Sequence, residues 1–258
     1  MTHQPKIILI SGATAGFGRA TAECFAKEFP ECKLILTGRR QERLEELKAS
    51  LPVPVHLLVQ DIRDTEKVQQ DIATLPDAFR DIDMLINNAG LAIGTEALHA
   101  KPLQDCLDMI DTNNKGLITL THAVLPGMVE RRNGYVINIG SIAGNYAYPG
   151  GNVYCATKAF VNHFSLNLRA DVKGKNIRVT CVEPGAVETE FSVVRFKGNQ
   201  EKADQVYEGY RKLTADHIAE TLYWLASRPP EFNVNHIEVM PTDQSFNGLS
   251  FDDGGSTD

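Results

Sequence analysis

Three residues in the middle of the chain have the types and the spacing that proton transfer requires. Tyr154 and Lys158 stand four residues apart, which places both side chains on one face of a helix. Free tyrosine has a pKa of about 10 and is a poor base at neutral pH, but a nearby ammonium stabilises the phenolate and lowers that pKa. Ser141 comes 13 residues before Tyr154, just past an expected strand. We therefore expect Tyr154 to pass a proton to or from a substrate oxygen while a hydride moves, and Ser141 to hold the same oxygen.

A glycine-rich segment near the N-terminus lies between an expected strand and an expected helix. Gly12 can make the turn, Gly16 lets the backbone approach a pyrophosphate, and Gly18 lets the helix pack close to the sheet. The N-terminus of the helix would then offer free N–H groups to phosphates. The alternative is a glycine-rich turn in some other α/β protein. The strand before it and the helix after it favour nucleotide binding.

The residues that end the second expected strand favour NADP over NAD. An NAD-binding protein usually has an acidic residue there, about 20 residues past the glycines, to hold the ribose 2′-hydroxyl. This chain has Gly38 followed by Arg39 and Arg40. A carboxylate would repel a 2′-phosphate, whereas an arginine can bind it through two hydrogen bonds. The alternative is a solvated basic start of the next helix, because glutamates follow.

Two further segments at strand ends could line the same ligand. Asp61, followed by Ile62, could accept a hydrogen bond from an adenine amino group, although such an aspartate is more often a helix cap. Asn87-Asn88-Ala89-Gly90 closes the fourth expected strand. Its small and amide side chains could line the cofactor and tie neighbouring strands together, although the segment alone is typical of a turn.

The elements that must position these residues alternate along the chain. Short apolar runs predict strands at 6–11, 33–37, 54–59, 83–87, 135–140, 177–182 and 234–240. Helical patterns cover 17–28, 41–49, 64–73, 103–110, 113–131 and 153–172, and another helix starts near 214. This alternation predicts a single α/β domain over 1–258, a doubly wound Rossmann-type parallel sheet of about seven strands with helices on both faces. A TIM barrel is the alternative, but the glycines follow the first strand, as in a dinucleotide fold.

Composition excludes several classes of protein. The chain has 258 residues, of which 43% are hydrophobic and 23% charged, so it is neither disordered nor collagen-like. Its formal net charge of −7 argues against a nucleic-acid partner and against binding to a membrane through a polybasic surface. No apolar run approaches the ~18 residues of a membrane span. The five scattered cysteines lack metal-ligand spacing, so we expect no metal and no disulfide framework, and the cytoplasm fits best.

These residues together resemble the short-chain dehydrogenase/reductase family over essentially the whole chain. The matching positions are Gly12, Gly16, Gly18, Asn87-Asn88-Ala89-Gly90, Asn113, Ser141, Tyr154, Lys158 and Pro184-Gly185. In that family the tyrosine is the general acid/base, the lysine also binds the nicotinamide ribose, the serine polarises the substrate carbonyl, and the asparagine supports a proton relay through water. Asn113 rather than Asn114 matches the family's D-x-N pattern.

The resemblance implies a set of site residues. The catalytic residues would be Asn113, Ser141, Tyr154 and Lys158. The residues that bind the cofactor NADP would be Gly12, Thr14, Gly16, Phe17, Gly18, Arg39, Arg40, Asp61, Ile62, Asn88, Ala89, Gly90, Tyr154, Lys158, Pro184, Gly185, Val187 and Thr189.

Several segments narrow the resemblance to the NADP-dependent 3-hydroxy acid dehydrogenases. These segments are 12–18, 37–44, 111–116, 151–154 and 191–198. That branch oxidises serine, L-allo-threonine and related 3-hydroxy acids and reduces malonic semialdehyde. The resemblance also implies a homodimer or homotetramer. Two other functions stay open: an NADPH-dependent carbonyl reductase of another substrate class, and a non-catalytic NADPH-binding sensor.

A small 3-hydroxy acid needs a partner for its carboxylate, because an unpaired buried anion costs several kcal/mol. Ser141 and Tyr154 would hold the reacting oxygen, and Lys158 is already committed to Tyr154 and the cofactor. Arg195 lies ten residues past Gly185, within an expected substrate lid at 186–212, and its planar fork suits a carboxylate. The alternatives are that Arg195 is a surface residue of a mobile lid or binds a cofactor phosphate. The polar tail at 241–258 is expected to be ordered only where it docks on the rest of the chain.

Overall fold

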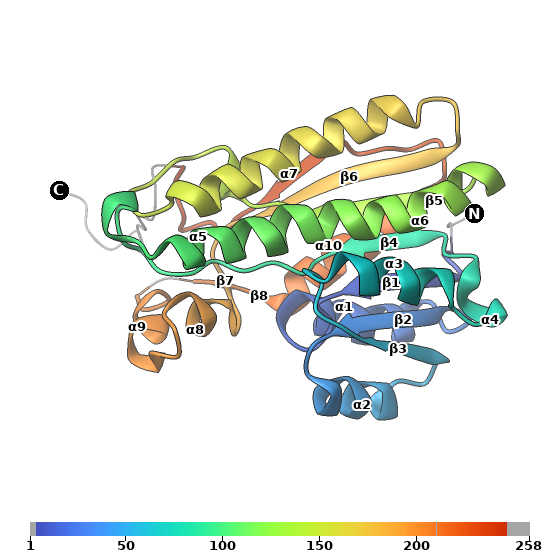
Figure 1. Cartoon of the computed structure of the whole chain (residues 1–258), viewed down its shortest axis with the longest axis horizontal. Coiled ribbons are helices and arrows are strands. Elements are labelled where there is room, and N and C mark those ends of the chain that lie inside the picture. Colours follow the sequence, from blue (N-terminus) through green and yellow to red (C-terminus); the bar gives the residue numbers. More distant parts are fainter. Residues whose placement is uncertain (1–3, 210, 247–258) are drawn as a thin grey trace.

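The structure, a computed structural model, describes residues 4–209 and 211–246. Its centre is a parallel sheet with the strand order β3-β2-β1-β4-β5-β6-β9 (Figure 1). These strands are β1 (Ile7–Ser11), β2 (Lys33–Gly38), β3 (Val55–Val59), β4 (Met84–Asn87), β5 (Gly134–Ile139), β6 (Ile177–Pro184) and β9 (His236–Val239). The order reverses between β1 and β4, which is where a doubly wound fold binds its ligand. The predicted fold class is confirmed, and the sheet is open rather than a barrel.

Helices connect the strands and cover both faces of the sheet (Figure 1). The longer helices are α1 (Gly16–Glu28), α2 (Gln41–Ser50), α3 (Thr65–Ala73), α5 (Leu103–Ile110), α6 (Leu117–Arg131), α7 (Asn152–Asp171) and α10 (Ala215–Ala226). The core places α1, α2 and α10 on one face and α3, α6 and α7 on the other. Asp64 caps α3, as its position in the sequence suggests, by accepting a hydrogen bond from the Lys67 N–H at 3.0 Å. No helix among the described residues is long and apolar enough to cross a bilayer.

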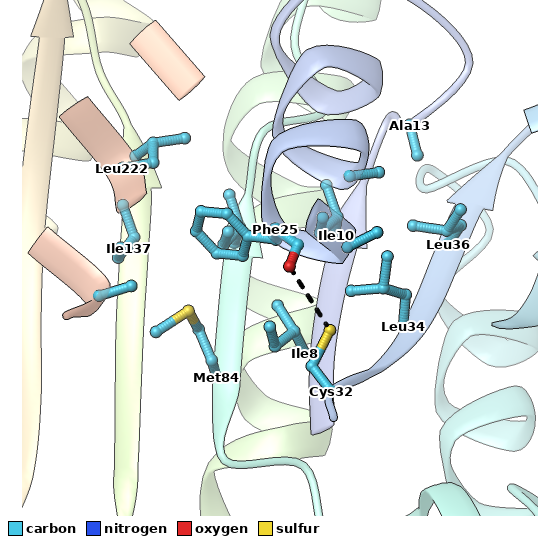
Figure 2. Packing of buried hydrophobic residues seen from close by; sticks show 14 of the residues in the cluster. Ile8, Ile10, Ala13, Phe25, Cys32, Leu34, Leu36, Met84, Ile137 and Leu222 are labelled. Carbon is cyan, nitrogen blue, oxygen red and sulfur yellow. Dashed lines mark hydrogen bonds between the residues drawn. The ribbon is translucent and has the colours of Figure 1, made fainter. Parts of the chain in front are cut away.

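The apolar run at the start of the chain explains why the sheet is buried on both sides. Side chains of a strand alternate between faces, so Ile8 and Ile10 enter the core under α1 while Ile7 and Leu9 enter the opposite core. Figure 2 shows Phe25 of α1 packed over Ile8 and Ile10. Because Phe25 is fully buried, truncating such a side chain to alanine costs about 3–5 kcal/mol. This packing fixes the strand end that leads into the glycine-rich segment.

Several element boundaries differ from the prediction, most clearly in the following three elements. The expected helix at 113–131 begins with a wide π-turn, η2 (Asp111–Gly116), which joins α5 to α6 without a break. The strand β6 continues to Pro184, since its last residues pair with β9. The last strand β9 is shorter than expected and comprises His236–Val239.

The segment between β6 and α10 contains elements that the sequence pattern did not reveal. They are β7 (Val187–Glu188), α8 (Phe191–Arg195), α9 (Gln200–Gln205) and β8 (Leu213–Thr214), with β7 and β8 paired in a small sheet of their own. These elements lie together next to the end of β6 (Figure 1). The remaining short turns are α4 (Asp77–Arg80), η1 (Leu98–Ala100) and η3 (Ile142–Gly144). Helices this short carry too few residues to show a period.

Candidate active site

An elongated cavity runs along the carboxyl ends of the central strands. It extends from Arg39 and Arg40 at one end to Ser141 and Tyr154 at the other. The residues predicted to form the site that line it are Gly12, Thr14, Gly16, Phe17, Arg39, Arg40, Asp61, Ile62, Asn88, Ala89, Gly90, Ser141, Tyr154, Lys158, Pro184, Gly185, Val187 and Thr189. The predicted site residues Gly18, Asn113 and Arg195 are not among the residues that line it.

The glycine-rich turn is held against the end of β4. Gly12 and Gly16 have φ angles of +68° and +52°, which side-chain-bearing residues rarely adopt. The Asn88 Nδ2 donates to the carbonyl oxygens of Ser11 and Gly12, at 2.8 and 3.1 Å. Ser11 Oγ in turn accepts from the Asn88 backbone N–H at 3.0 Å. The strand-tying role expected of the asparagine segment is therefore present at the switch point of the sheet.

The end of the cavity beside β2 is basic. A Cβ on Gly38 would come within 2.6 Å of the Thr14 methyl, so a side chain at position 38 would displace Thr14. Arg40 donates from Nε and Nη2 to Thr14 Oγ1, at 3.2 and 2.8 Å. Its Nη1, together with Nη1 of Arg43 on α2, pairs with the carboxylate of Glu190. The sequence did not single out Arg43 or Glu190, which are far apart along the chain.

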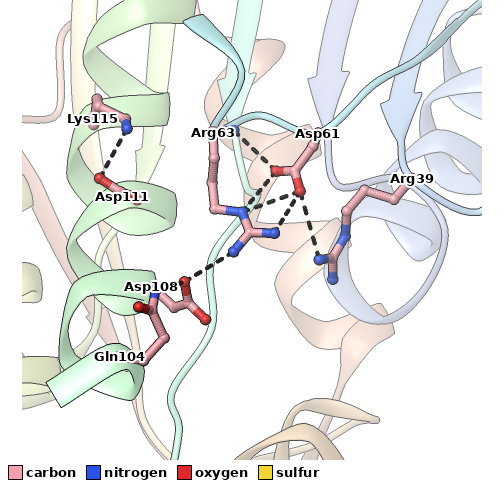
Figure 3. A network of polar contacts seen from close by, with 7 residues as sticks. All are labelled: Arg39, Asp61, Arg63, Gln104, Asp108, Asp111 and Lys115. Atoms are coloured by element: carbon pink, nitrogen blue, oxygen red, sulfur yellow. Dashed lines mark hydrogen bonds and ion pairs between the residues drawn. The ribbon is translucent and has the colours of Figure 1, made fainter.

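Asp61 is held as an ionised acceptor at the end of β3. Arg63 Nη2 lies 2.8 Å from Asp61 Oδ2, and Arg63 Nη1 lies 3.1 Å from Asp108 Oδ1 (Figure 3). Hydrogen bonds from the Arg63 side chain hold the pKa of Asp61 below its usual value, against the opposing effect of burial. Arg39 approaches the same carboxylate more loosely, at 3.8 Å. The residue that caps α3 is Asp64 rather than Asp61, and Asp61 lines the cavity.

The far end of the cavity brings together the three residues expected to move a proton. Tyr154 and Lys158 are buried on α7, and Ser141 follows β5. The Lys158 Nζ donates to the Ile139 carbonyl at 2.8 Å and lies 5.9 Å from the centre of the Tyr154 ring. Ser141 Oγ accepts from the Ala143 N–H at 3.1 Å and donates to the Pro184 carbonyl at 3.5 Å.

The expected lowering of the Tyr154 pKa is wrong for the chain itself. Burial raises the pKa of Tyr154 well above its ordinary value, because a phenolate loses its hydration there. A hydrogen bond with Ser141 and the charge of Arg195 lower it only in part. Burial also lowers the pKa of Lys158 to about 8. The spacing of the pair could be read from the sequence, but the extent to which burial removes water from both groups could not.

Asn113 lies in the π-turn η2, next to Lys158. Its Oδ1 accepts from the Leu91 N–H at 2.8 Å, and its Nδ2 donates to the Leu91 carbonyl at 2.9 Å. A Cβ on Gly90 would stand 3.3 Å from Asn113 Oδ1 and 3.6 Å from Lys158 Nζ, so Gly90 keeps the space between them open. The neighbouring Asn114 donates instead to the Thr157 carbonyl at 2.9 Å. Wide turns of this kind inside helices occur frequently at functional sites.

Arg195 ends α8 close to the buried tyrosines. Its Nη2 donates to the Tyr148 hydroxyl at 3.1 Å, and its guanidinium carbon lies 5.4 Å from the centre of the Tyr148 ring. Its backbone carbonyl accepts from the Gly94 N–H at 2.8 Å, which ties α8 to the segment that follows β4. The Arg195 Nε is buried and meets no acceptor within the described part of the chain. Tyr148 was not predicted, because nothing in its own neighbourhood in the sequence marks it.

Gln244 and Glu183 make the contacts that hold the loop after β6 in place. Gln244, in the described part of the C-terminal tail, accepts through Oε1 from the Ala186 N–H at 2.8 Å. Glu183 is 1% exposed; its Oε1 lies 2.6 Å from His236 Nδ1, and its Oε2 accepts from Asn145 Nδ2 at 2.9 Å. The tail thus docks as far as residue 246, and residues 247–258 lie outside the described residues.

The ends of β6 and β9 carry a group of possible metal ligands that the sequence spacing did not suggest. Cys181, Glu183 and His236 bring their ligand atoms within 4.8 Å of one another. His236 comes from β9 and the other two residues from β6, so their spacing in sequence carries no motif. His236 and Asn145 each contact one oxygen of Glu183, so these contacts tie the end of β6 to β9 and to the loop after β5.

This arrangement defines a class of protein. The chain belongs to the short chain dehydrogenase family, whose sequence pattern matches residues 6–200. Its relatives include a serine 3-dehydrogenase of Rhizobium radiobacter, 54% identical over 94% of this chain and 96% of that protein. The NADP-dependent 3-hydroxy acid dehydrogenase YdfG of Salmonella typhi is 54% identical over 95% of this chain and 98% of that protein.

Solved structures agree with these relatives. The closed form of a serine dehydrogenase complexed with NADP⁺ superimposes with a TM-score of 0.90 at 50% identity, covering 95% of this chain and 98% of that one. A serine dehydrogenase from Escherichia coli gives a TM-score of 0.80 at 46% identity, covering 93% of this chain and 99% of that one. The family inferred from the sequence is confirmed.

Proposed function

We propose that this chain is an NADP-dependent dehydrogenase that oxidises the hydroxyl group of a small 3-hydroxy acid. Serine, L-allo-threonine and 3-hydroxypropionate, with malonic semialdehyde in the reverse direction, are the substrates we favour. The names of relatives that share half of the residues support this choice. The observation that carries it is Arg195, whose guanidinium lies against Tyr148 and within electrostatic reach of Tyr154.

The residues along the cavity fit NADP. Arg40, which donates to Thr14 Oγ1, stands where we place the 2′-phosphate, and Gly38 brings no carboxylate to oppose it. We assign the adenine amino group to Asp61, whose ionised carboxylate lines the cavity, and the turn at the pyrophosphate to Gly12. When bound, the cofactor accepts the hydride at its nicotinamide ring. Everything else in the reaction falls to side chains of this chain.

The protein's part in the reaction is to hold one oxygen and move one proton. We assign Ser141 to hold the substrate hydroxyl. We assign Tyr154, once its own proton has passed toward Lys158, to take the proton of that hydroxyl as the carbonyl forms. Burial lowers the pKa of Lys158 to about 8, so its ammonium can lose and regain a proton near neutral pH. We therefore assign Lys158 to receive the proton that leaves Tyr154. Asn113, fixed by both Leu91 contacts, holds the space beside Lys158 in which a water could complete that path.

Arg195 supplies the partner for the substrate carboxylate. A buried donor without an acceptor is uncommon in folded proteins, and a substrate carboxylate would supply the acceptor that the Arg195 Nε lacks among the described residues. The Tyr148 hydroxyl holds the guanidinium in place from one side. A carboxylate bound there lies near Tyr154, as a short acid with a hydroxyl on its third carbon requires.

We also propose that the chain assembles through its helices and works in the cytoplasm. Large apolar side chains on α5, α6 and α7 are exposed, namely Leu103, Leu107, Ile110, Ile118, Phe160 and Leu166. Surfaces of this kind mark interfaces, which supports a homodimer or homotetramer. All five cysteines are unpaired, which supports a reducing compartment.

The test is a steady-state assay of NADPH formation with matched acids and alcohols. Serine, L-allo-threonine and 3-hydroxyisobutyrate should each give a higher kcat/KM than 2-methyl-1-propanol by roughly 10- to 150-fold, the factor that one charge-assisted contact contributes. An equal response to the neutral alcohol would indicate a carbonyl reductase of another class. Binding of NADP without turnover of any substrate would indicate a sensor.

A further inference from the structure

A carboxylate of the lid lies across the basic end of the cavity. Glu190 immediately precedes α8, and its Oε2 lies 3.0 Å from Arg40 Nη1. Its Oε1 lies 2.7 Å from Arg43 Nη1, so one carboxylate bridges two arginines of the α2 start. Burial would raise the pKa of Glu190, but hydrogen bonds from Arg43 and Arg40 hold it below its usual value, so the bridge is ionic at neutral pH.

The bridge uses the same groups that a 2′-phosphate would use. Arg40 and Glu190 both line the cavity, and Arg40 reaches Thr14 of the glycine-rich segment with its other donors. Guanidinium groups bind carboxylates and phosphates with the same forked geometry. Arg43 lies within reach of the same carboxylate, although nothing in its sequence position suggested a role.

We propose that Glu190 competes with the 2′-phosphate of NADP for Arg40 and Arg43, and that Arg43 is a further phosphate-binding residue. This inference rests on the proposed use of NADP. The competition affects the affinity for NADP but not for NAD. The 2′-phosphate of NADP must displace the Glu190 carboxylate from Arg40 and Arg43, whereas NAD has no phosphate at that position.

The strength of the competition follows from exposure. Glu190, Arg40 and Arg43 keep 40–49% of their side-chain surface exposed, so each ion pair is screened by water. Exposed pairs of this kind change an equilibrium constant by roughly one and a half- to fivefold each. A phosphate carries almost two charges at neutral pH and therefore displaces a single carboxylate. Removing the charge of Glu190 should tighten NADP by about three- to tenfold.

Calorimetric titration with NADP and with NAD, without substrate, tests the proposal. Glu190→Gln should lower the Kd for NADP by about three- to tenfold and leave that for NAD unchanged. Arg43→Gln should raise the Kd for NADP by about three- to tenfold, again without effect on NAD. Glu188→Gln is the matched control, since this exposed carboxylate pairs with Lys212 at 2.8 Å and loses the same charge. Its Kd values should stay within about twofold of the parent.

The outcomes separate this inference from the proposed function. If Glu190→Gln binds NADP no more tightly than the parent, or if both cofactors tighten equally, the competition is refuted. An unchanged Kd in Arg43→Gln removes Arg43 from the phosphate site. Failure of the parent to bind NADP at all would instead refute the proposed cofactor.

Discussion

Replacing Lys158 by methionine removes a buried ammonium while keeping a side chain of similar length. Lys158 is 6% exposed, and its Nζ donates to the Ile139 carbonyl at 2.8 Å. Burial lowers the pKa of Lys158 from the ordinary 10.5 to about 8. The unfolded chain therefore binds more protons than the folded chain between pH 8 and 10.5, and the free energy of unfolding rises with pH over that interval. Below pH 8 the folded protein bears the full penalty of burying the charge.

The size of the effect follows from the two pKa values. The lowering to about 8 corresponds to about 3 kcal/mol of destabilisation at pH 7, which methionine relieves. The substitution also removes the hydrogen bond and leaves the Ile139 carbonyl without that donor, which costs about 1–2 kcal/mol. We expect Lys158→Met to unfold with a free energy about 1–2 kcal/mol higher than the parent at pH 7. By pH 10 the relieved penalty falls below about 1 kcal/mol, so the gain disappears.

Urea denaturation followed by circular dichroism at pH 7, 9 and 10 measures this difference. Protein concentration is held constant, because assembly shifts apparent stability. Lys173→Met, at an exposed position, is the control and should stay within about 0.5 kcal/mol of the parent at every pH. A variant at Lys158 that is less stable than the parent at pH 7, or a gain that does not shrink with pH, would refute the reasoning.

Three further substitutions test the site. Tyr154→Phe should lower kcat by about 10²–10⁴-fold while the Kd for NADP stays unchanged; retention of more than about a tenth of kcat would mean that another group carries the proton. Arg195→Lys should raise KM for 3-hydroxy acids far more than for a neutral alcohol and leave KM for NADP nearly unchanged, whereas a uniform loss would assign Arg195 to the lid alone. Gly38→Asp should weaken NADP by more than about tenfold without creating tight NAD binding, because its Cβ collides with Thr14; good NAD binding would show that Thr14 moves aside freely.

The regular elements and the local motifs could be predicted because their signals are local. The buried run Ile7 to Ile10 marks β1, and the four-residue spacing of Tyr154 and Lys158 places both on one face of α7. Each of these features depends on residues within one or two turns of one another. The same holds for the glycine turn, whose positive φ angles require glycine.

Contacts between distant segments could not be predicted in this way. Arg195 meets Tyr148 across 47 residues, and Glu190 meets Arg43 across 147 residues. Both pairs depend on where the fold places α8 and the residue before it. The sequence does not reveal this helix, because five residues are too few to show a helical period. Burial is also a property of the whole fold, which is why the expected direction of the Tyr154 pKa was wrong.

Transfer of deuterium from substrate to cofactor tests the central claim most directly. The protein is incubated with NADP⁺ and 3-hydroxyisobutyrate in which deuterium replaces both hydrogens on the hydroxyl-bearing carbon, and the reduced cofactor is analysed by mass spectrometry. If the chain oxidises 3-hydroxy acids by hydride transfer, each NADPH formed carries one deuterium, and Tyr154→Phe forms almost none. Reduced cofactor without deuterium, or no reduction with any 3-hydroxy acid while a neutral alcohol reacts, would contradict the account.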